Sequence, residues 1–233
     1  MSSFYSVAVD GPSGAGKSTL SRRCAAAFGF IYVDTGAIYR TIALAARRRN
    51  TDVRDENEVK KILPELEVGM VYDDSGEQRM LLNGEDVSSE IRMPDISVTA
   101  SAVAALPAVR AYLLEMQRKI ARENNVIMDG RDIGTVVLPD AQLKIFLTAS
   151  PEARAERRLA ELRQKGIEQS YESVLSDIIE RDRRDTSRAA APLRKAENAV
   201  TVDTSMLNFE ESFEKLCGII SSRLHIERLS EKE

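Results

Sequence analysis

The octapeptide GPSGAGKS, Gly11–Ser18, has residue types and a spacing that suit the binding of phosphate groups. It fits the pattern G-x-x-x-x-G-K-[ST] at every fixed position. Glycines let the backbone wrap closely around phosphates, and a helix that starts here adds partial positive charge. Lys17 can reach the β- and γ-phosphates, and the Ser18 hydroxyl can bind Mg²⁺. We therefore expect a purine nucleoside triphosphate with Mg²⁺ at Gly11, Pro12, Ser13, Gly14, Ala15, Gly16, Lys17, Ser18 and Thr19.

Two further polar segments follow predicted strands. In MDGRDIGT, Asp129 ends an apolar strand, where a carboxylate can hold Mg²⁺ directly or through water, and Arg131 and Asp132 come next. In DTGAIYR, Thr35 offers a hydroxyl and Arg40 lies on the first turns of a helix. Ligands of open parallel sheets bind at the carboxyl ends of strands. The alternatives are a tight loop with a local Arg–Asp pair and an ordinary surface arginine.

Arginines also recur at helical spacing after Pro151. Arg154, Arg157 and Arg158 are three and four residues apart, which predicts one face of a helix. Such arginines can neutralise phosphate charge, and we expect Arg157 to contact ATP and Arg158 to be catalytic. Which of these arginines touches the transferred phosphoryl group stays open. The alternative is a solvated helix whose glutamates pair with one or two of these arginines.

The stretch ERDRRDTSR, residues 180–188, carries both signs of charge. On a helix, one face would present Arg181, Arg184, Asp185 and Arg188. Arginines clustered around a carboxylate suit a polar anionic ligand better than plain solubility. Asp182 and Arg183 should then face solvent, while Arg184 is either a ligand contact or a support for Asp185.

The elements that must position these residues alternate between strand and helix. Strands are expected at 4–10, 30–34, 126–130, 143–149 and 199–205, and helices at 17–29, 36–49, 151–188 and 208–224. This alternation predicts an α/β fold with a parallel sheet flanked by helices. Residues 55–106 differ, because segments 66–74 and 78–87 read as short antiparallel strands. A helical stretch over 93–125, interrupted near Pro107, follows that insertion.

Composition narrows the function classes. The chain of 233 residues has 43% hydrophobic residues and a net charge of −4, which argues against a dedicated nucleic-acid binder. Its two cysteines, Cys24 and Cys217, are expected to be free thiols in a reducing compartment. No signal peptide or spanning apolar run is recognisable, so a cytoplasmic protein is expected. The single histidine, His225, leaves no residues for a histidine-based triad or metal site.

Three classes of nucleotide-binding protein compete for this pattern. A GTPase needs an N-K-x-D segment, which does not occur in the chain. A larger ATPase module usually works on a nucleic-acid polymer, and the net charge of −4 argues against such a substrate. A small-molecule kinase needs arginines outside the phosphate loop to bring a second anion to the γ-phosphate, and this chain has them. A non-enzymatic module that binds a nucleotide and a partner protein is the further alternative.

Taken together, the motifs GPSGAGKS, D[ST]GAIYR, DGRD with Gly134-Thr135, and ERDxRDxxR resemble those of bacterial cytidylate kinases over essentially the whole chain. The resemblance implies transfer of the γ-phosphoryl group of ATP to CMP or dCMP. We also expect a monomer whose partners include neither a nucleic-acid polymer nor a membrane. It implies one kinase unit of three parts. These are a P-loop core (1–34, 107–150 and 189–233), an NMP-binding part (35–106) and a lid with the following arginine helix (151–188).

The resemblance also implies roles for individual residues. It suggests Ser101, Arg110 and Asp132 at the cytosine, Arg181 and Asp185 at the sugar, and Arg40, Arg131 and Arg188 at the acceptor phosphate near Thr35. Lys17, Arg131, Arg158 and Arg188 would then be catalytic. Some members have serine at position 35, where this chain keeps a hydroxyl. Kinases for UMP, AMP, dTMP or a non-nucleotide such as shikimate remain the alternatives.

Overall fold

The computed structural model describes residues 4–164 and 166–230, and the chain divides into two compact units. The first unit joins two separate stretches, Met1–Tyr32 and Asn124–Glu233. The second unit is continuous and comprises Val33–Glu123. The three-part division expected from the resemblance stays a prediction.

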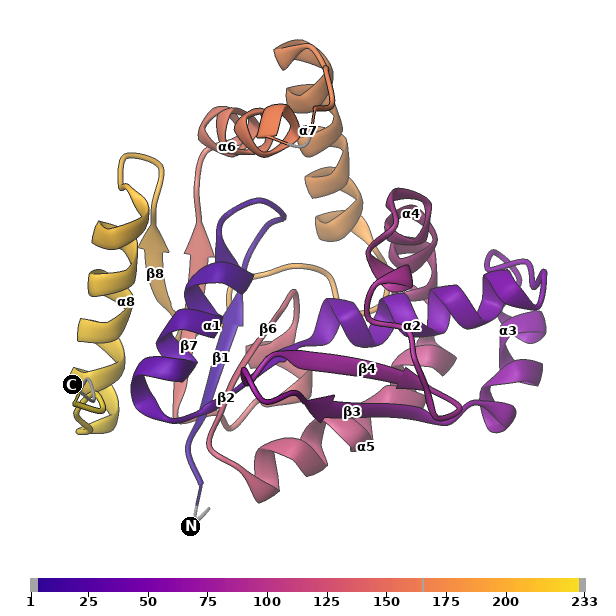
Figure 1. Ribbon diagram of the computed structural model, residues 1–233, viewed down its shortest axis with the longest axis horizontal. Coiled ribbons are helices and arrows are strands. Elements are labelled where there is room, and N and C mark those ends of the chain that lie inside the picture. Colours follow the sequence, from indigo (N-terminus) through magenta and orange to yellow (C-terminus); the bar gives the residue numbers. More distant parts are fainter. Residues whose placement is uncertain (1–3, 165, 231–233) are drawn as a thin grey trace. The chain divides into compact units, whose positions relative to one another are not determined.

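The first unit is built on a sheet that carries the phosphate loop. Five strands, β1 (Ser6–Asp10), β2 (Ile31–Asp34), β6 (Val126–Gly130), β7 (Leu143–Thr148) and β8 (Val200–Asp203), lie in the order β2-β6-β1-β7-β8 (Figure 1). The pairs β1–β6, β1–β7 and β7–β8 are parallel. β1 therefore lies at the centre, and its apolar residues are buried on both faces, as expected for a parallel sheet. The predicted parallel sheet is confirmed.

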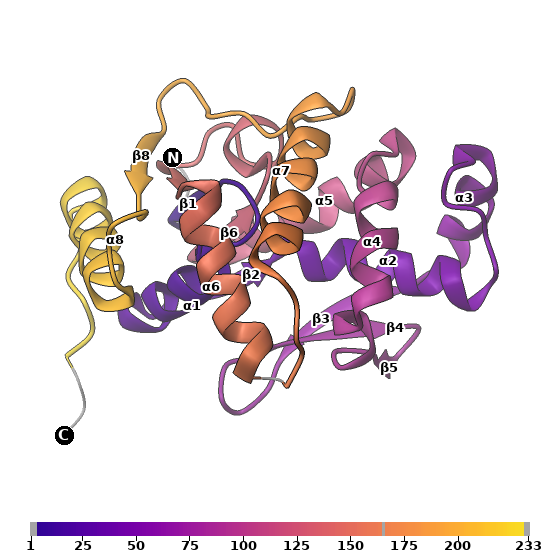
Figure 2. The same cartoon turned by 90° about the horizontal axis from the view of Figure 1, so that it is seen from above.

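Two helices cover one face of this sheet. α1 (Lys17–Phe28) follows the phosphate loop and α8 (Phe209–Leu224) packs beside it (Figures 1 and 2). Their apolar residues and those of β1 and β7 form one buried cluster, which includes Cys24 and Cys217. The two cysteines are free, as predicted. α8 starts with a capping box, since the side chains of Asn208 and Glu211 accept from each other's backbone N–H groups.

A helical hairpin follows β7 in the same unit. α6 (Pro151–Gln164) and α7 (Tyr171–Ser187) pack on each other through buried side chains that include Leu159 and Ile178. The Ser150 hydroxyl accepts from Ala153 N at 3.1 Å and so caps the start of α6. α7 ends at Ser187, one residue before Arg188.

The second unit is organised around one helix that is buried on almost all sides. It consists of α2 (Thr35–Arg48), α3 (Glu56–Ile62), η1 (Leu63–Glu65), β3 (Val68–Tyr72), β4 (Gln78–Leu82), β5 (Glu85–Asp86), η2 (Glu90–Arg92), α4 (Pro94–Val103) and α5 (Pro107–Glu123). The segment from Ile42 to Ala46 of α2 is wholly buried, which explains its continuous apolar sequence. The strands form an antiparallel sheet in the order β3-β4-β5, so the predicted antiparallel insertion and the helix break near Pro107 are confirmed.

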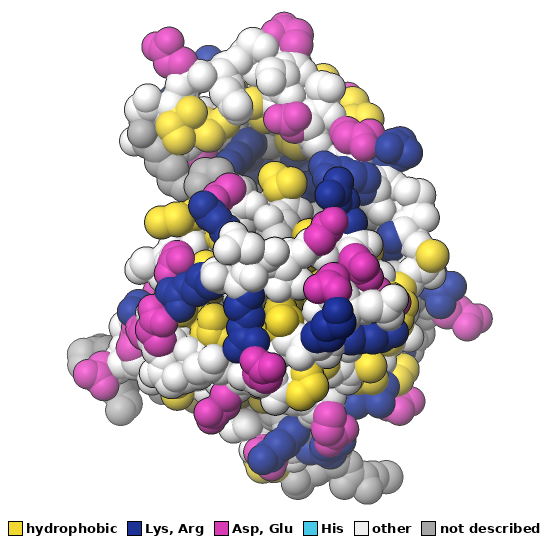
Figure 3. Space-filling view, turned by 90° about the vertical axis from the view of Figure 1, so that its right-hand side faces the viewer, with side chains coloured by type: hydrophobic (Ala, Val, Ile, Leu, Met, Phe, Trp, Pro, Cys, Tyr) yellow, Lys and Arg dark blue, Asp and Glu magenta, His cyan; other side chains and the backbone are white. Residues whose placement is uncertain are grey.

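Charged side chains on the surface of the second unit are mostly paired. Arg48 bonds both Glu85 and Glu90, and Arg79 bonds Asp86. Figure 3 shows the same intermingling of basic and acidic side chains on one face of the molecule. Within residues 4–164 and 166–230, no single helix is long and apolar enough to cross a membrane. Asp95–Val103 and Pro107–Glu123 pass that test only as a pair, which is bent by 94°.

Candidate active site

The phosphate loop has the backbone geometry that its glycines predict. Gly11 has a φ of 153°, and a Cβ at this position would lie 1.9 Å from the carbonyl oxygen of Leu147. Gly14 and Gly16 have positive φ values of 77° and 88°, which glycine adopts without strain. α1 starts at Lys17, so the free N–H groups of its first turn point toward the loop. The loop is therefore shaped to bind an anion at a helix N-terminus.

Lys17 is buried beneath this loop. Its ammonium donates to the carbonyl oxygen of Pro12 at 2.7 Å, which keeps the side chain folded back along the loop. Burial, and next the charge of Arg131, lower the pKa of Lys17 to about 7. The carboxylates of Asp129 and Asp10 oppose this effect. A bound polyphosphate would add negative charge beside Lys17 and would therefore favour its protonated form.

The two residues predicted to bind Mg²⁺ lie together. Ser18 donates its hydroxyl to Asp129 Oδ2 at 2.8 Å, and the Tyr32 hydroxyl donates to Asp129 Oδ1 at 3.1 Å. A hydroxyl beside a carboxylate is an oxygen donor set that suits Mg²⁺, which keeps other positions for water and phosphate oxygens. Among the described residues, no three His, Cys, Asp or Glu side chains gather into a metal site. These two side chains therefore fit Mg²⁺ that is held largely by a nucleotide.

Asp10, at the end of β1, was not predicted as a site residue. It is 3% exposed, and its two carboxylate oxygens accept from Ile133 N and Gly134 N, each at 2.7 Å. These bonds fix the segment that carries Arg131 and Asp132. Burial raises the pKa of Asp10 to about 6, although both backbone bonds act in the opposite direction. The only sequence feature that could have indicated this role is the position of an aspartate directly before the phosphate loop. The sequence does not show which backbone groups that aspartate binds.

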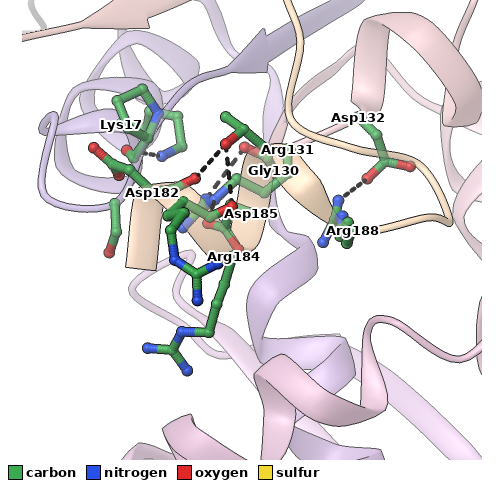
Figure 4. Close-up of polar contacts among 12 residues, drawn as sticks. Lys17, Gly130, Arg131, Asp132, Asp182, Arg184, Asp185 and Arg188 are labelled. Atoms are coloured by element: carbon green, nitrogen blue, oxygen red, sulfur yellow. Dashed lines mark hydrogen bonds and ion pairs between the residues drawn. The ribbon is translucent and has the colours of Figure 1, made fainter. Parts of the chain in front are cut away.

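The predicted acceptor residues of the first unit form two Arg–Asp pairs (Figure 4). Arg131 Nε donates to Asp185 Oδ2 at 2.7 Å, which joins the β6 loop to α7. Arg188 Nη2 lies 3.6 Å from Asp132 Oδ1; the Asp132 side chain is buried and that of Arg188 is partly buried. Burial alone would raise the pKa of Asp185, but Arg131, followed by Arg181 and Arg188, holds it below its ordinary value. The structure therefore brings Arg131, Asp132, Arg181, Asp185 and Arg188 into one cluster of opposite charges.

The remaining charged residues of α7 have other partners. Asp182, which was expected to face solvent, instead accepts from Arg154 through both oxygens, so this expectation was wrong. Arg183 is exposed, as expected, and pairs with Glu180. Arg184 also bonds Glu180, both at the carboxylate and at the backbone oxygen. Arg184 therefore does not support Asp185 in this structure.

The three arginines of α6 point to different partners. Arg154 is 2% exposed and reaches the phosphate loop, where it donates to Ser13 O at 3.0 Å. Arg157 donates to the hydroxyl and carbonyl oxygens of Thr204. Arg158 is about half exposed and pairs with Glu161 at 3.1 Å. A spacing that places three arginines on one helix face therefore does not give their guanidinium groups a common partner.

Four predicted acceptor residues belong to the second unit. Thr35 is buried at the start of α2, and Asp34, which caps this helix through Ala37 N, also accepts from Arg40 at 2.8 Å. Arg110, on α5, lies over the ring of Tyr39 and donates to Ala104 O at 3.0 Å. Ser101 lies on α4 and is partly buried. In this unit, sequence reasoning missed the carboxylate of Asp34 that holds Arg40.

Comparison with known proteins identifies the family. The sequence profile described as cytidylate kinase matches residues 7–222. A cytidylate kinase of Carboxydothermus hydrogenoformans is 49% identical over 93% of this chain and 97% of its own length. One from Caldanaerobacter subterraneus is 50% identical over 90% of this chain and 92% of its own length.

Solved structures show the fold at a much greater sequence distance. An uncharacterised protein from Eubacterium ventriosum matches 94% of this chain and 99% of its own chain, with a TM-score of 0.50 and 12% identity. That likeness concerns the fold alone. The sequence matches cover almost the full length of both partners at about half identity. The chain therefore belongs to the cytidylate kinase family of phosphotransferases.

Proposed function

We propose that this protein transfers the γ-phosphoryl group of ATP to CMP or dCMP and releases ADP with CDP or dCDP. The observation that carries this proposal is membership of the cytidylate kinase family over residues 7–222. The site supports it, because a phosphate loop and a cluster of Arg–Asp pairs with buried carboxylates belong to the same unit. No histidine or other general base is needed, since the attacking group is already a phosphate oxygen.

On the donor side, the triphosphate of ATP would lie along Gly11–Thr19 and receive the free N–H groups at the start of α1. Lys17 would leave Pro12 O and turn toward the β- and γ-phosphates, because a phosphate oxygen is a stronger acceptor for an ammonium than a carbonyl. Ser18 and Asp129 would hold Mg²⁺, directly or through water. The ion, when bound, would neutralise part of the charge on the transferred group.

On the acceptor side, Asp132 would accept from the cytosine N4 amino group, with Ser101 and Arg110 also at the base. Uracil presents an O4 acceptor at the same place, which would leave a buried carboxylate facing another oxygen. Such a mismatch costs on the order of a few kcal/mol. The double anchoring of the 133–134 backbone by Asp10 supports this role, since it fixes where the Asp132 side chain starts.

The sugar and phosphate of the acceptor would meet charged side chains. Asp185, steadied by Arg181, would accept from a sugar hydroxyl, while Arg131 and Arg188 would bind the acceptor phosphate. These arginines pair with Asp185 and Asp132 in the structure, so the acceptor must compete with these ion pairs. We further propose Thr35 and Arg40 of the second unit as contacts of the acceptor phosphate. Arg157 is proposed to contact ATP, and Arg158 the transferred group.

The proposal is tested by measuring ADP release with CMP, dCMP, UMP and AMP at equal concentrations in the presence of ATP and Mg²⁺. We expect turnover with CMP and dCMP that clearly exceeds turnover with UMP and AMP. Equal rates with UMP and CMP would show that Asp132 does not read the base. Nucleotide binding without CMP-dependent ADP release would refute the kinase assignment. Activity as a cytoplasmic monomer remains a prediction from the sequence.

A further inference from the structure

Arg154 is the one arginine of α6 that is fully enclosed by protein. It is 2% exposed, and its guanidinium has partners on three different segments. Nε donates to Ala149 O at 3.0 Å, immediately before α6. Nη1 donates to Ser13 O in the phosphate loop at 3.0 Å, and both terminal nitrogens bond the carboxylate of Asp182 on α7. The side chain thus joins the ends of β7 and α7 to the loop.

The contact with the loop involves more than one hydrogen bond. A Cβ on Gly14 would lie 3.5 Å from Cβ of Arg154 and 3.8 Å from its Cγ, so the arginine stem runs along the backbone of the loop. The carbonyl of Ser13 is one of the loop groups that points away from a bound phosphate if the neighbouring N–H groups point toward it. A donor that holds this carbonyl outward therefore favours the phosphate-binding arrangement of the loop.

Asp182 determines where the guanidinium lies. Its carboxylate is engaged through both oxygens, a planar fork arrangement that fixes the orientation of an arginine as well as its position. Asp182 lies one turn before Asp185 on α7, and Asp185 in turn bonds Arg131 (Figure 4). The same helix therefore carries the anchor of the loop contact and the residues proposed for the acceptor. Arg154 connects these two sides of the reaction within the first unit.

We propose that Arg154 is a positioning residue for phosphoryl transfer, and that Asp182 holds it against the phosphate loop. Neither side chain has to touch a substrate in this role. The pair sets the conformation of the loop at Ser13 and keeps α7 in register with it, so that donor and acceptor groups meet correctly. This inference rests on the proposed kinase function. A misplacement of about 1 Å can reduce the rate of a reaction about a hundredfold.

The chain offers a matched control on the same helix. Glu180 pairs with Arg183 on the exposed side of α7, two residues before Asp182. Asp182→Asn removes the carboxylate that holds the buried Arg154, whereas Glu180→Gln removes an exposed carboxylate and leaves the loop contact intact. Exposed pairs contribute little to stability. Arg154→Lys tests the fork, because an ammonium keeps the charge but cannot bond two carboxylate oxygens and Ser13 O in one plane.

The experiment measures equilibrium binding of N-methylanthraniloyl-ATP and steady-state CMP phosphorylation for these variants. For Asp182→Asn and Arg154→Lys we expect a dissociation constant about tenfold higher, as for one lost charge-assisted contact. We expect kcat to fall about ten- to a hundredfold. Glu180→Gln should stay within about twofold of the unchanged protein in both quantities. The double variant should lose no more than the worse single variant, because both changes remove the same pair.

A purely structural role of the pair gives a different result. It lowers the unfolding temperature and the fraction of protein that binds nucleotide, but leaves the dissociation constant of the binding fraction unchanged. That result, or a kcat of Asp182→Asn equal to that of Glu180→Gln, would overturn the proposal. If Asp182→Asn does not fold, Asp182→Glu keeps the charge and should recover most of the activity. Equally low activity of folded Asp182→Glu and Arg154→Lys would also contradict it.

Failure of the kinase assignment would be recognised separately. If the unchanged protein does not phosphorylate CMP, the proposed function is wrong, whatever the variants do. Binding of N-methylanthraniloyl-ATP still reports on the loop in that case. Weaker binding by Asp182→Asn but not by Glu180→Gln would then support the loop contact by itself, and equal binding would refute it.

Discussion

Replacing Asp10 by asparagine tests the electrostatics of the site most directly. Asp10 is almost completely buried, and burial raises its pKa from 3.8 to about 6 despite two backbone hydrogen bonds. A carboxyl group with a higher pKa in the folded state binds its proton more tightly when folded. Its contribution to stability is therefore complete below about pH 3.8 and is lost as the pH rises through about 6. Each pKa unit corresponds to about 1.4 kcal/mol, so the loss amounts to about 3 kcal/mol.

Asparagine has the shape of the protonated carboxyl group and does not titrate. At about pH 4 the two proteins should therefore have similar free energies of unfolding, and above about pH 7 the variant should be more stable by up to about 3 kcal/mol. The assay is urea unfolding followed by circular dichroism at a series of pH values. The difference between the two proteins reports Asp10 together with its effect on Lys17, whose pKa the Asp10 carboxylate raises.

A difference that does not change with pH would refute the electrostatic reasoning. If the variant instead became less stable than the unchanged protein as the pH rises, the bonds from Ile133 N and Gly134 N would stabilise the ionised carboxylate by more than burial destabilises it. The same variant should raise the KM for CMP more than the KM for ATP. Asparagine accepts through one oxygen only, so one of these backbone N–H groups loses its acceptor and the segment after Asp132 loosens.

Three further substitutions have distinct expected outcomes. Asp132→Ala should raise the KM for CMP at least about tenfold in steady-state kinetics and leave the affinity for N-methylanthraniloyl-ATP nearly unchanged in a titration. An equal loss of affinity for CMP and for the ATP analogue would contradict a role of Asp132 at the base. Arg188→Met should lower kcat by about a hundredfold or more in the same kinetic assay, and an unchanged kcat would show that Arg188 is not catalytic. Gly11→Ala should abolish nucleotide binding, because the new Cβ would lie 1.9 Å from Leu147 O; calorimetric titration that shows normal ATP affinity would refute this.

The fold and the conformation of the phosphate loop could be predicted well because both depend on local patterns. Alternating apolar segments specify a parallel sheet, and the glycines of the loop need conformations that few other residues adopt. The Ser18–Asp129 contact could also be predicted, since Ser18 lies in the first turn of the helix that follows β1, and Asp129 lies near the end of β6, the parallel neighbour of β1. In each case the element and its place in the fold determine the position of the side chain.

The ion pairs could not be predicted because they depend on the direction of long side chains. Arg154, Arg157 and Arg158 have the spacing of one helix face, yet the structure gives each a different partner. Asp182 was assigned to solvent because it is not part of the i, i+3, i+4, i+7 set formed by Arg181, Arg184, Asp185 and Arg188. Nothing local indicates Arg154 on another helix. Asp10 was missed for a related reason. Its partners are backbone N–H groups 123 and 124 residues away, and any residue type except proline supplies such a group.

The interrupted course of the first unit has a consequence for the order in which the protein can fold during synthesis. β1 pairs with β6 from Ser6 opposite Val126 onward, so the central strand has to wait until nearly 120 further residues have been made. The second unit, by contrast, is complete at Glu123, before β6 exists. Domains generally fold as units as they emerge, and non-local strand pairing is slow. The second unit therefore forms first, and the phosphate loop acquires its neighbours on β6 and β7 only afterwards. Ile31 N bonds Asn125 O at 2.9 Å, so the two ends of the inserted segment lie close together. Once the second unit has folded, joining β1 to β6 across this segment therefore costs less entropy than closing a flexible loop of the same length.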